Sequence, residues 1–166
     1  MKKTTSKARV VTHKRAGKAA AGADYRIVVG LGSCGIAAGG HKVKAALLES
    51  LRQAGTAAQV SDTGCVGMCY REVLMDIHQK DGRVYTYGNM TPDRMPRLVE
   101  EHLMKGQPVS DWLVRASDRA LEDDSFYAKQ KRIVLRNCGQ MDPEKLDDYP
   151  SRSEEHTSEL QSPNTI

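Results

Sequence analysis

The pattern of apolar and polar positions along the first two-thirds of the chain predicts an α/β domain. Residues 25–31 (YRIVVGL) are almost continuously apolar and end in glycines, which is typical of a buried strand. Residues 37–54 have the three- and four-residue spacing of an amphipathic helix, with apolar positions at Val43, Leu47, Leu51 and Ala54. Gly55 follows as a C-terminal cap, and residues 57–63 predict a second strand. A strand–helix–strand crossover of this kind makes the two strands parallel.

A hairpin and a further helix complete the predicted domain. Residues 73–78 and 83–87 have the composition of strands, and Asp81-Gly82 between them favours a tight turn because both positions tolerate positive φ. Thr91 is placed to act as the N-cap of the next helix. The apolar stripe of that helix, ended by Gly106, comprises Met95, Leu98, Val99 and Leu103. The order β-α-β-β-β-α predicts a thioredoxin-like α/β fold with a mixed four-stranded sheet flanked by helices.

Charge is concentrated at the beginning of the chain. Residues 1–23 contain seven Lys or Arg and no acid, whereas residues 24–150 contain 17 basic and 18 acidic residues. We therefore expect a disordered basic leader over residues 1–23, a folded domain over residues 24–110, and no nucleic-acid partner. The chain has neither the apolar core of a secretory signal nor the roughly 18 apolar residues of a membrane span. This composition predicts a cytoplasmic protein without direct membrane insertion.

The last third of the chain predicts no second complete domain. Residues 111–150 are mostly polar, and we expect a linker followed by the start of a truncated domain. The run RSEEHTSELQS at residues 152–162 resembles the conceptual translation of a sequencing adapter. We therefore expect residues 151–166 to be an artefact and the natural protein to continue beyond Tyr149.

Three of the four cysteines lie in glycine-rich loops that the predicted topology brings together. Cys34 follows the first strand in GLGSCG, and Cys65 and Cys69 follow the second strand in TGCVGMC. Loops that follow neighbouring parallel strands emerge at the same edge of a sheet, so the three sulfurs are expected to converge. Thiolates in such loops are suited to an iron–sulfur cluster, because backbone N–H groups can turn towards sulfur. The alternative is that these cysteines are small buried packing residues.

Two other chemistries are compatible with parts of this pattern. The segment from Gly30 to Gly35 matches GxGxxG between a strand and a helix, and Asp62 ends the second strand as a ribose-binding acid would. A dinucleotide site is disfavoured because a hairpin interrupts the fold after one crossover. Thiol–disulfide exchange through Cys65 and Cys69 is disfavoured because redox dithiols usually have two intervening residues rather than three.

Three longer stretches resemble a known protein family. GLGSCGIAAGG, TGCVGMCYREVLMDI and YGNMTPDRMPRLVEEHLMKGQPV are similar to the thioredoxin-like [2Fe–2S] ferredoxin module of NADH dehydrogenases and NAD(P)-linked hydrogenases. FYAKQKRIVLRNCGQMDPEKLDDY resembles the start of the flavin subunit that follows the fused module, as in the flavin subunit of NADH-quinone oxidoreductase. The resemblance covers about residues 25–149.

The match to the module's cluster motif is incomplete. Its four cysteines are arranged as Cys-x4-Cys and Cys-x3-Cys, and the last three of these positions correspond to Cys34, Cys65 and Cys69. The first position falls on Val29, which cannot ligate iron. The resemblance implies a [2Fe–2S] cluster whose fourth ligand is Ser33, His41, water or another subunit, or else a vestigial site. Cys138 matches no ligand of the module and is expected to be a packing residue.

The resemblance also implies what the chain takes part in. The intact subunit would oxidise NADH at FMN and pass electrons through iron–sulfur centres to quinone-reducing or hydrogenase partners, attached to the inner membrane only through those subunits. The sites for FMN, NAD(H) and a [4Fe–4S] cluster would follow Tyr149. No catalytic residue is therefore expected in these 166 residues. The alternative is a cluster-free docking module that seats the flavin domain in its complex.

Overall fold

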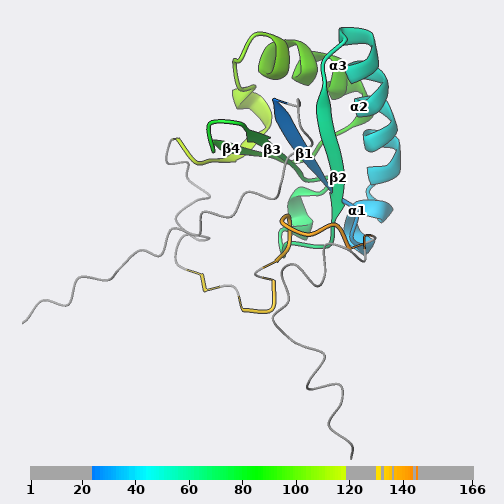
Figure 1. Cartoon of the computed structure of the whole chain (residues 1–166). Coiled ribbons are helices and arrows are strands. Elements are labelled where there is room, and N and C mark those ends of the chain that lie inside the picture. The colour runs from blue at the N-terminus through cyan, green and yellow to red at the C-terminus, as the bar shows by residue number, and fades with distance from the viewer. Residues whose placement is uncertain (1–23, 119–129, 132, 136, 144, 146–166) are drawn as a thin grey trace, which may run out of the picture.

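The computed structural model describes residues 24–118, 130, 131, 133–135, 137–143 and 145. The expected leader at 1–23 and the residues at 151–166 lie outside this set. Five strands form one mixed sheet in the spatial order β2-β1-β3-β4-β5 (Figure 1). The strands are β1 (Tyr25–Gly30), β2 (Ala58–Thr63), β3 (Met75–Gln79), β4 (Val84–Tyr87) and β5 (Leu113–Ala116).

The predicted crossover and hairpin are both confirmed. β1 pairs with β2 in parallel, and β3 lies antiparallel between β1 and β4. At the hairpin turn, the amide of Gly82 donates to the carbonyl of Gln79 (3.0 Å), and the amide of Arg83 donates to the Asp81 carboxylate (3.0 Å). The sequence pattern therefore placed four strands correctly and in the right directions.

The prediction of a four-stranded sheet is wrong by one strand. β5 pairs antiparallel with β4, with a register irregularity between Thr86 and Tyr87. It lies within residues 111–150, where the sequence predicts a linker. Val114 and Ala116 of β5 are buried, so this edge strand packs as part of the domain rather than passing over its surface.

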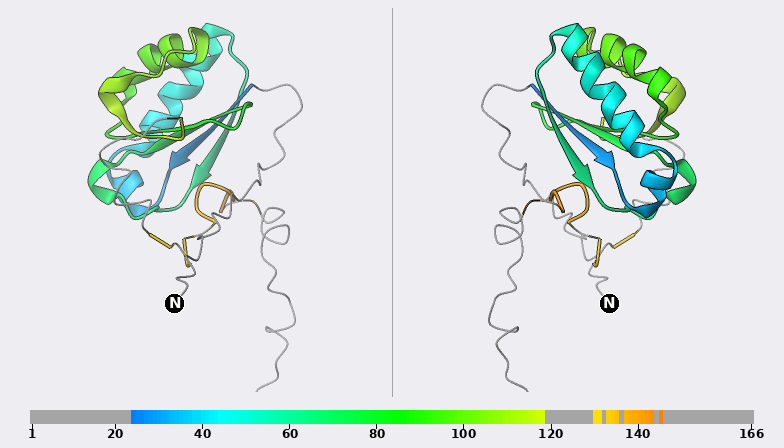
Figure 2. Two further views of the ribbon diagram at one scale, coloured as in Figure 1. Left: turned by 90° about the vertical axis from the view of Figure 1, so that its left-hand side faces the viewer. Right: turned by 90° about the vertical axis from the view of Figure 1, so that its right-hand side faces the viewer.

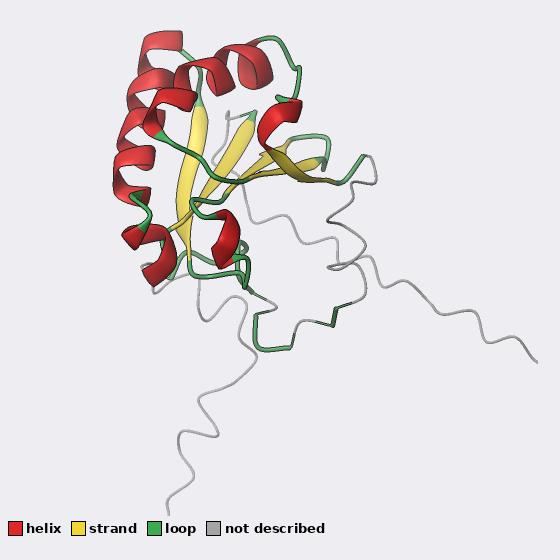
Figure 3. Cartoon of the chain, turned by 180° about the vertical axis from the view of Figure 1, so that it is seen from behind, coloured by secondary structure: helices red, strands yellow, loops and turns green. Residues whose placement is uncertain are grey.

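The helices cover one face of the sheet (Figure 3). The predicted helix over residues 37–54 corresponds to α2 (Gly40–Ala54); a separate short helix, α1 (Ser33–Ala37), precedes it, and Gly39 between the two has a φ of 91°. The predicted cap at Gly55 is confirmed, because its left-handed backbone lets its amide donate to the carbonyl of Arg52. The second helical segment comprises a 3-10 turn (Pro92–Arg94), α3 (Met95–Leu98) and a π-helical stretch (Val99–Met104).

The apolar positions predicted from helical spacing form the core between these helices and the sheet. The buried helix residues, each at most 6% exposed, are Val43, Leu47, Leu51, Met95, Leu98, Val99 and Leu103. They pack against one face of the central strands, through Ile27 and Val29 of β1 and Met75 and Ile77 of β3. Thr91 is the N-cap residue with Pro92 in the first turn, as predicted, although its hydroxyl makes no capping hydrogen bond.

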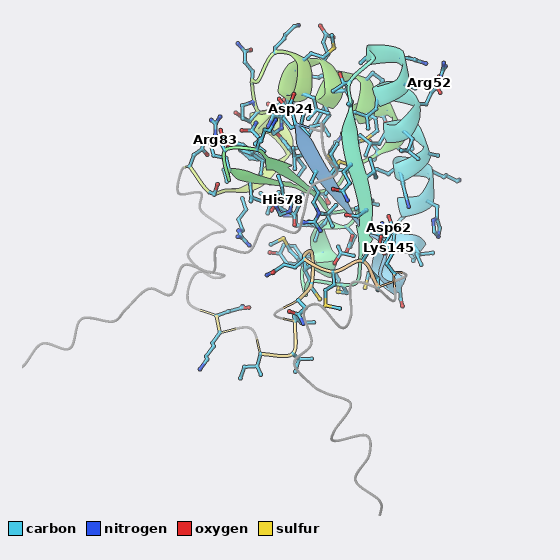
Figure 4. All side chains as sticks on the ribbon, viewed as in Figure 1. Asp24, Arg52, Asp62, His78, Arg83 and Lys145 are labelled. Atoms are coloured by element: carbon cyan, nitrogen blue, oxygen red, sulfur yellow. The ribbon has the colours of Figure 1, made fainter. Side chains whose placement is uncertain are left out.

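The opposite face of the sheet is polar. The cross-strand register places Ser61, Val28, Asp76 and Thr86 side by side across four strands, and Arg26 and His78 in the neighbouring row. His78 is labelled in Figure 4. The Thr86 hydroxyl donates to the Asp76 carboxylate (2.6 Å). Side chains of this polarity suit a face that polar backbone covers, and the backbone of Gly139 contacts this face through hydrogen bonds with Thr63 and Arg26. Among the described residues, no helix has the length and apolarity needed to cross a bilayer.

Candidate metal centre

Three loops meet at the end of the sheet where β1 and β2 finish and β3 begins. The amide of Gly30 donates to the carbonyl of Leu74 (2.9 Å), which joins the end of β1 to the start of β3. The amide of Leu31 donates to the carbonyl of Thr63 (2.8 Å), which joins the loops that follow β1 and β2. Figure 2 shows both parallel strands pointing towards this end of the domain. These backbone hydrogen bonds therefore hold the loops that carry the cysteines next to one another.

The predicted convergence of three sulfurs is confirmed. Cys34 lies in the first turn of α1, Cys65 in the loop after β2, and Cys69 at the start of a 3-10 helix (Cys69–Arg71). The Sγ of Cys69 is 3.2 Å from that of Cys34 and 3.3 Å from that of Cys65. All three sulfurs lie within 4.8 Å of one another, and none is in a disulfide. The loops thus form one group of thiols suited to a single metal site.

Hydrogen bonds around the sulfurs show what a bound cation would change. The amide of Gly67 donates to Cys65 Sγ (3.3 Å), which confirms the expectation that a glycine N–H turns towards sulfur. Hydrogen bonds with Cys34 and then Cys65 raise the pKa of the exposed Cys69 thiol to about 12. Three thiolates this close would repel one another, so this arrangement requires protons on the sulfurs or a bound cation. A cation that replaces those protons would stabilise the same arrangement.

Close approach of the two loops depends on Gly32. A Cβ at Gly32 would lie 2.7 Å from the amide nitrogen of Cys65 and 3.1 Å from its Cβ. Contacts this short with backbone do not occur without a shift of the chain. The glycine at this position therefore sets the separation between the loop of Cys34 and the loop of Cys65.

The three-sulfur group includes neither the buried Val29 position nor His41. Val29 is fully buried in the core formed with α2, which agrees with the prediction that it supplies no ligand. Ser33 and His41 are exposed. Among the described His, Cys, Asp and Glu side chains, the only group of three or more that converges closely enough for a metal is the three-cysteine group.

The dinucleotide alternative does not fit this geometry. Asp62, the expected ribose-binding acid, is buried and forms an ion pair with Lys44 of α2 at 2.6 Å. In addition, β3 pairs antiparallel beside β1, whereas a dinucleotide fold continues with parallel strands. The glycines of the GxGxxG segment instead bring the Cys34 loop against the ends of β1 and β2.

The structure brings to the site a fourth cysteine, Cys138, which the sequence predicted to be a packing residue. The Sγ of Cys138 lies 3.7 Å from the carbonyl oxygen of Cys65. The segment that carries it runs across the end of the sheet near α1 (orange in Figures 1 and 2). One signal in the sequence points the same way, because Cys138 precedes a glycine, as Cys34 does.

The arrangement can hold a thiophilic metal. Soft thiolate ligands favour zinc or iron–sulfur clusters over magnesium or calcium, which take oxygen ligands. Three converging thiols with a backbone N–H on one sulfur fit either zinc or an iron–sulfur cluster. Metal binding itself stays a prediction that the geometry favours.

No protein-family model matches the chain. The NADP-reducing hydrogenase subunit HndB of Solidesulfovibrio fructosivorans is 32% identical over 93 residues, which are 55% of this chain and 74% of HndB. The chain belongs to the HndB family. Membership rests on most of the length of HndB, whereas the resemblance to the flavin subunit of NADH-quinone oxidoreductase is not confirmed.

The fold of this HndB-family chain is also found in a solved structure. A thioredoxin-like [2Fe–2S] ferredoxin from Aquifex aeolicus aligns with a TM-score of 0.50 at 19% identity. The alignment covers 57% of this chain and 94% of the ferredoxin. The predicted thioredoxin-like fold is therefore confirmed, with five strands in place of four.

Proposed function

We propose that this chain is an electron-transfer module in which Cys34, Cys65 and Cys69 hold a [2Fe–2S] cluster. The observation that carries the proposal is the convergence of the three sulfurs within 4.8 Å, from loops at the end of two parallel strands. The fold is that of a protein described as a thioredoxin-like [2Fe–2S] ferredoxin, which favours this cluster over zinc.

The residues of the chain would bind, orient and tune this group. A [2Fe–2S] cluster supplies one-electron transfer when bound. The Gly67 amide, 3.3 Å from Cys65 Sγ, would stabilise negative charge on that sulfur. Cys69 is exposed and lies beside Tyr70, whose side chain is 64% exposed. This open side would give a redox partner close access to the site.

The proposed role lies within a larger assembly. HndB is named as a subunit of an NADP-reducing hydrogenase, so we propose that this chain also belongs to a multi-subunit complex of the hydrogenase or NADH dehydrogenase type. FMN, NAD(H) and a [4Fe–4S] cluster would be bound elsewhere in that complex. Electrons from NADH or NADPH would then reach a hydrogenase or quinone-reducing partner through the proposed complex.

A second candidate function is a docking module that binds no cluster. Val29 favours it, because the core occupies the place of the first ligand of the resembled motif. In this role the domain would only seat neighbouring subunits against one another. The two candidates differ in a directly measurable property, the metal and sulfide content.

Anaerobic reconstitution of the full chain with iron and sulfide tests the proposal. We expect about two irons and two sulfides per chain, together with a [2Fe–2S] EPR signal after reduction with dithionite. Cys65→Ser is expected to lose most of the bound iron and the signal, because it removes one of three converging sulfurs. Gly64→Ala, next to it in the same loop, is the matched control and should keep both, since its Cβ would meet nothing within 4 Å.

Two results would contradict the electron-transfer role. One zinc per chain without sulfide after expression would indicate a structural metal site. A folded chain with no stoichiometric metal, before and after reconstitution, would favour the docking module.

A further inference from the structure

A short segment after the sheet is fixed to the edge of the metal site by buried hydrogen bonds. The amide of Gly139 donates to the hydroxyl of Thr63 (2.7 Å), and the guanidinium of Arg26 donates to the carbonyl of Gly139 (3.1 Å). Thr63 lies two residues before Cys65, and Gly139 directly follows Cys138. These bonds therefore place the backbone of Cys138 beside the loop that carries two of the converging sulfurs.

The backbone conformation of Gly139 supports this placement. Its φ is 78°, and a Cβ here would lie 3.6 Å from the Asp76 carboxylate on the polar face of the sheet. An L side chain rarely adopts this φ, so glycine allows the turn that leads from Cys138 onto the sheet. Within the turn, the amide of Met141 donates to the carbonyl of Asn137 (3.2 Å). The turn is thus closed on itself as well as bound to the domain.

Two side chains of the segment contact the loop from Cys65 to Cys69. The half-buried Cys138 directs its Sγ to within 3.7 Å of the Cys65 carbonyl oxygen. Leu135 Cδ1 lies 3.9 Å from the place a Cβ of Gly67 would occupy. Figure 4 shows Asp62, close to the end of β2, and Lys145 of the segment at the same end of the sheet. The segment therefore lies over the outer side of the metal loop.

We propose that Cys138 is the fourth thiolate ligand of the metal bound by Cys34, Cys65 and Cys69. The proposal rests on the metal-binding function proposed above and names the ligand that its motif lacks. Structural zinc and [2Fe–2S] sites both take four protein ligands, and three sulfurs already converge here. Cys138 Sγ stands outside the close group of three sulfurs. Only the χ1 bond separates the sulfur from a backbone that is already held in place.

This assignment differs from the packing role predicted from the sequence. A packing cysteine would contact apolar side chains, whereas the Cys138 sulfur faces a backbone carbonyl of the metal loop. The contacts of Gly139 satisfy polar groups of the sheet and at the same time fix the backbone of Cys138 beside the metal loop. A ligand requires a defined backbone position, which these contacts supply.

Cobalt(II) titration of the full chain under reducing, anaerobic conditions tests the ligand without depending on a cluster. Sulfur-to-cobalt charge-transfer absorption grows with the number of bound thiolates. Cys138→Ser is therefore expected to lose about a quarter of that intensity, as one of four thiolates is removed. Ser33→Ala and His41→Gln, which change the rival candidates, are expected to leave it unchanged.

A positioning variant separates ligation from a general loss of structure. Thr63→Val keeps every cysteine but removes the acceptor of the Gly139 amide. One hydrogen bond contributes about 1 kcal/mol, so cobalt affinity is expected to fall about fivefold. The far-ultraviolet circular dichroism of both variants should match that of the parent chain.

The outcomes distinguish this inference from the proposed function. Four-thiolate cobalt absorption that depends on Cys138, in a chain that never assembles iron and sulfide, would support the ligand and contradict the electron-transfer role. A [2Fe–2S] spectrum and iron content unchanged by Cys138→Ser would overturn the ligand and leave the electron-transfer role in place. Cobalt absorption unchanged by Cys138→Ser would also overturn the ligand.

Discussion

Gly32→Ala is expected to weaken metal binding by about five- to a hundredfold while the domain remains folded. The new Cβ would lie 2.7 Å from the Cys65 amide nitrogen, so the two cysteine loops must move apart in the metal-free variant. Binding a metal would draw the loops together again and restore the clash. Overpacking costs about 1–3 kcal/mol, and about 1.4 kcal/mol corresponds to a tenfold change in affinity. Competition with a chromophoric chelator for zinc or cobalt measures this change directly.

Gly64→Ala is the matched control for this prediction. Gly64 directly precedes Cys65, yet a Cβ there would meet nothing within 4 Å. Its metal affinity should stay within about twofold of the parent chain, because a surface substitution of this kind changes free energies by about 0.5 kcal/mol or less. Equal losses in the two variants would show that the loop tolerates no alanine for a reason other than the contact between the loops.

The centre of the site, where the loops of Cys34 and Cys65 meet, could be predicted from the sequence. The convergence of Cys34 with Cys65 follows from local signals: an apolar strand, an amphipathic helix and a second strand. Parallel pairing then places both following loops at one edge, and the paired strands confirm it. Topology carries this part of the prediction, so no knowledge of individual contacts was needed.

The features that the sequence did not predict depend on long-range pairing. β5 has only four residues, and its identity as a strand comes from the antiparallel partner that β4 provides. The short helix α1, which precedes the predicted helix, is another such case, because its five residues are too few to show an apolar spacing. Tertiary context decides both elements, and short elements have the weakest local signal.

The position of Cys138 belongs to the same class. Gly139 contacts Thr63 and Arg26, which are 76 and 113 residues away in sequence. Polar contacts over such separations leave no periodic pattern, so the sequence of residues 137–142 did not indicate that they pack on this domain. Only the folded sheet, with its polar second face, shows where this segment lies.

We expect the domain to lose stability as the pH falls from 6.5 to about 4, because His102 is buried in its core. His102 is fully buried, with Nδ1 2.8 Å from the Tyr87 hydroxyl and Nε2 3.1 Å from the Gln79 side-chain amide. Tyr85 packs edge-on against the ring, with the centroids 4.8 Å apart. The Tyr87 hydroxyl also accepts the amide of Val109 (3.2 Å), which ties the neutral imidazole into the core.

Burial, and then the positive charge of Arg83, lower the pKa of His102 from 6.5 to about 4. The unfolded chain therefore binds a proton near pH 6.5, whereas the folded chain binds it only near pH 4. The contribution of the neutral His102 to the free energy of unfolding is fully present above pH 6.5. It falls as the pH decreases through this window, by up to about 3 kcal/mol. Urea unfolding of the full chain at pH 7, 6, 5 and 4, with chelator and reductant present, measures the loss.

His102→Gln isolates this effect from the other titrating groups. Burial also lowers the pKa of His78, which makes the parent chain more pH-dependent in the same direction. The variant is expected to be less stable at pH 7 but to lose about 3 kcal/mol less than the parent between pH 7 and pH 4. His41→Gln, which changes an exposed histidine of α2, should reproduce the parent's pH dependence. If His102→Gln reproduced it as well, the buried imidazole would be protonated in the folded chain, and its hydrogen bonds would need a different assignment.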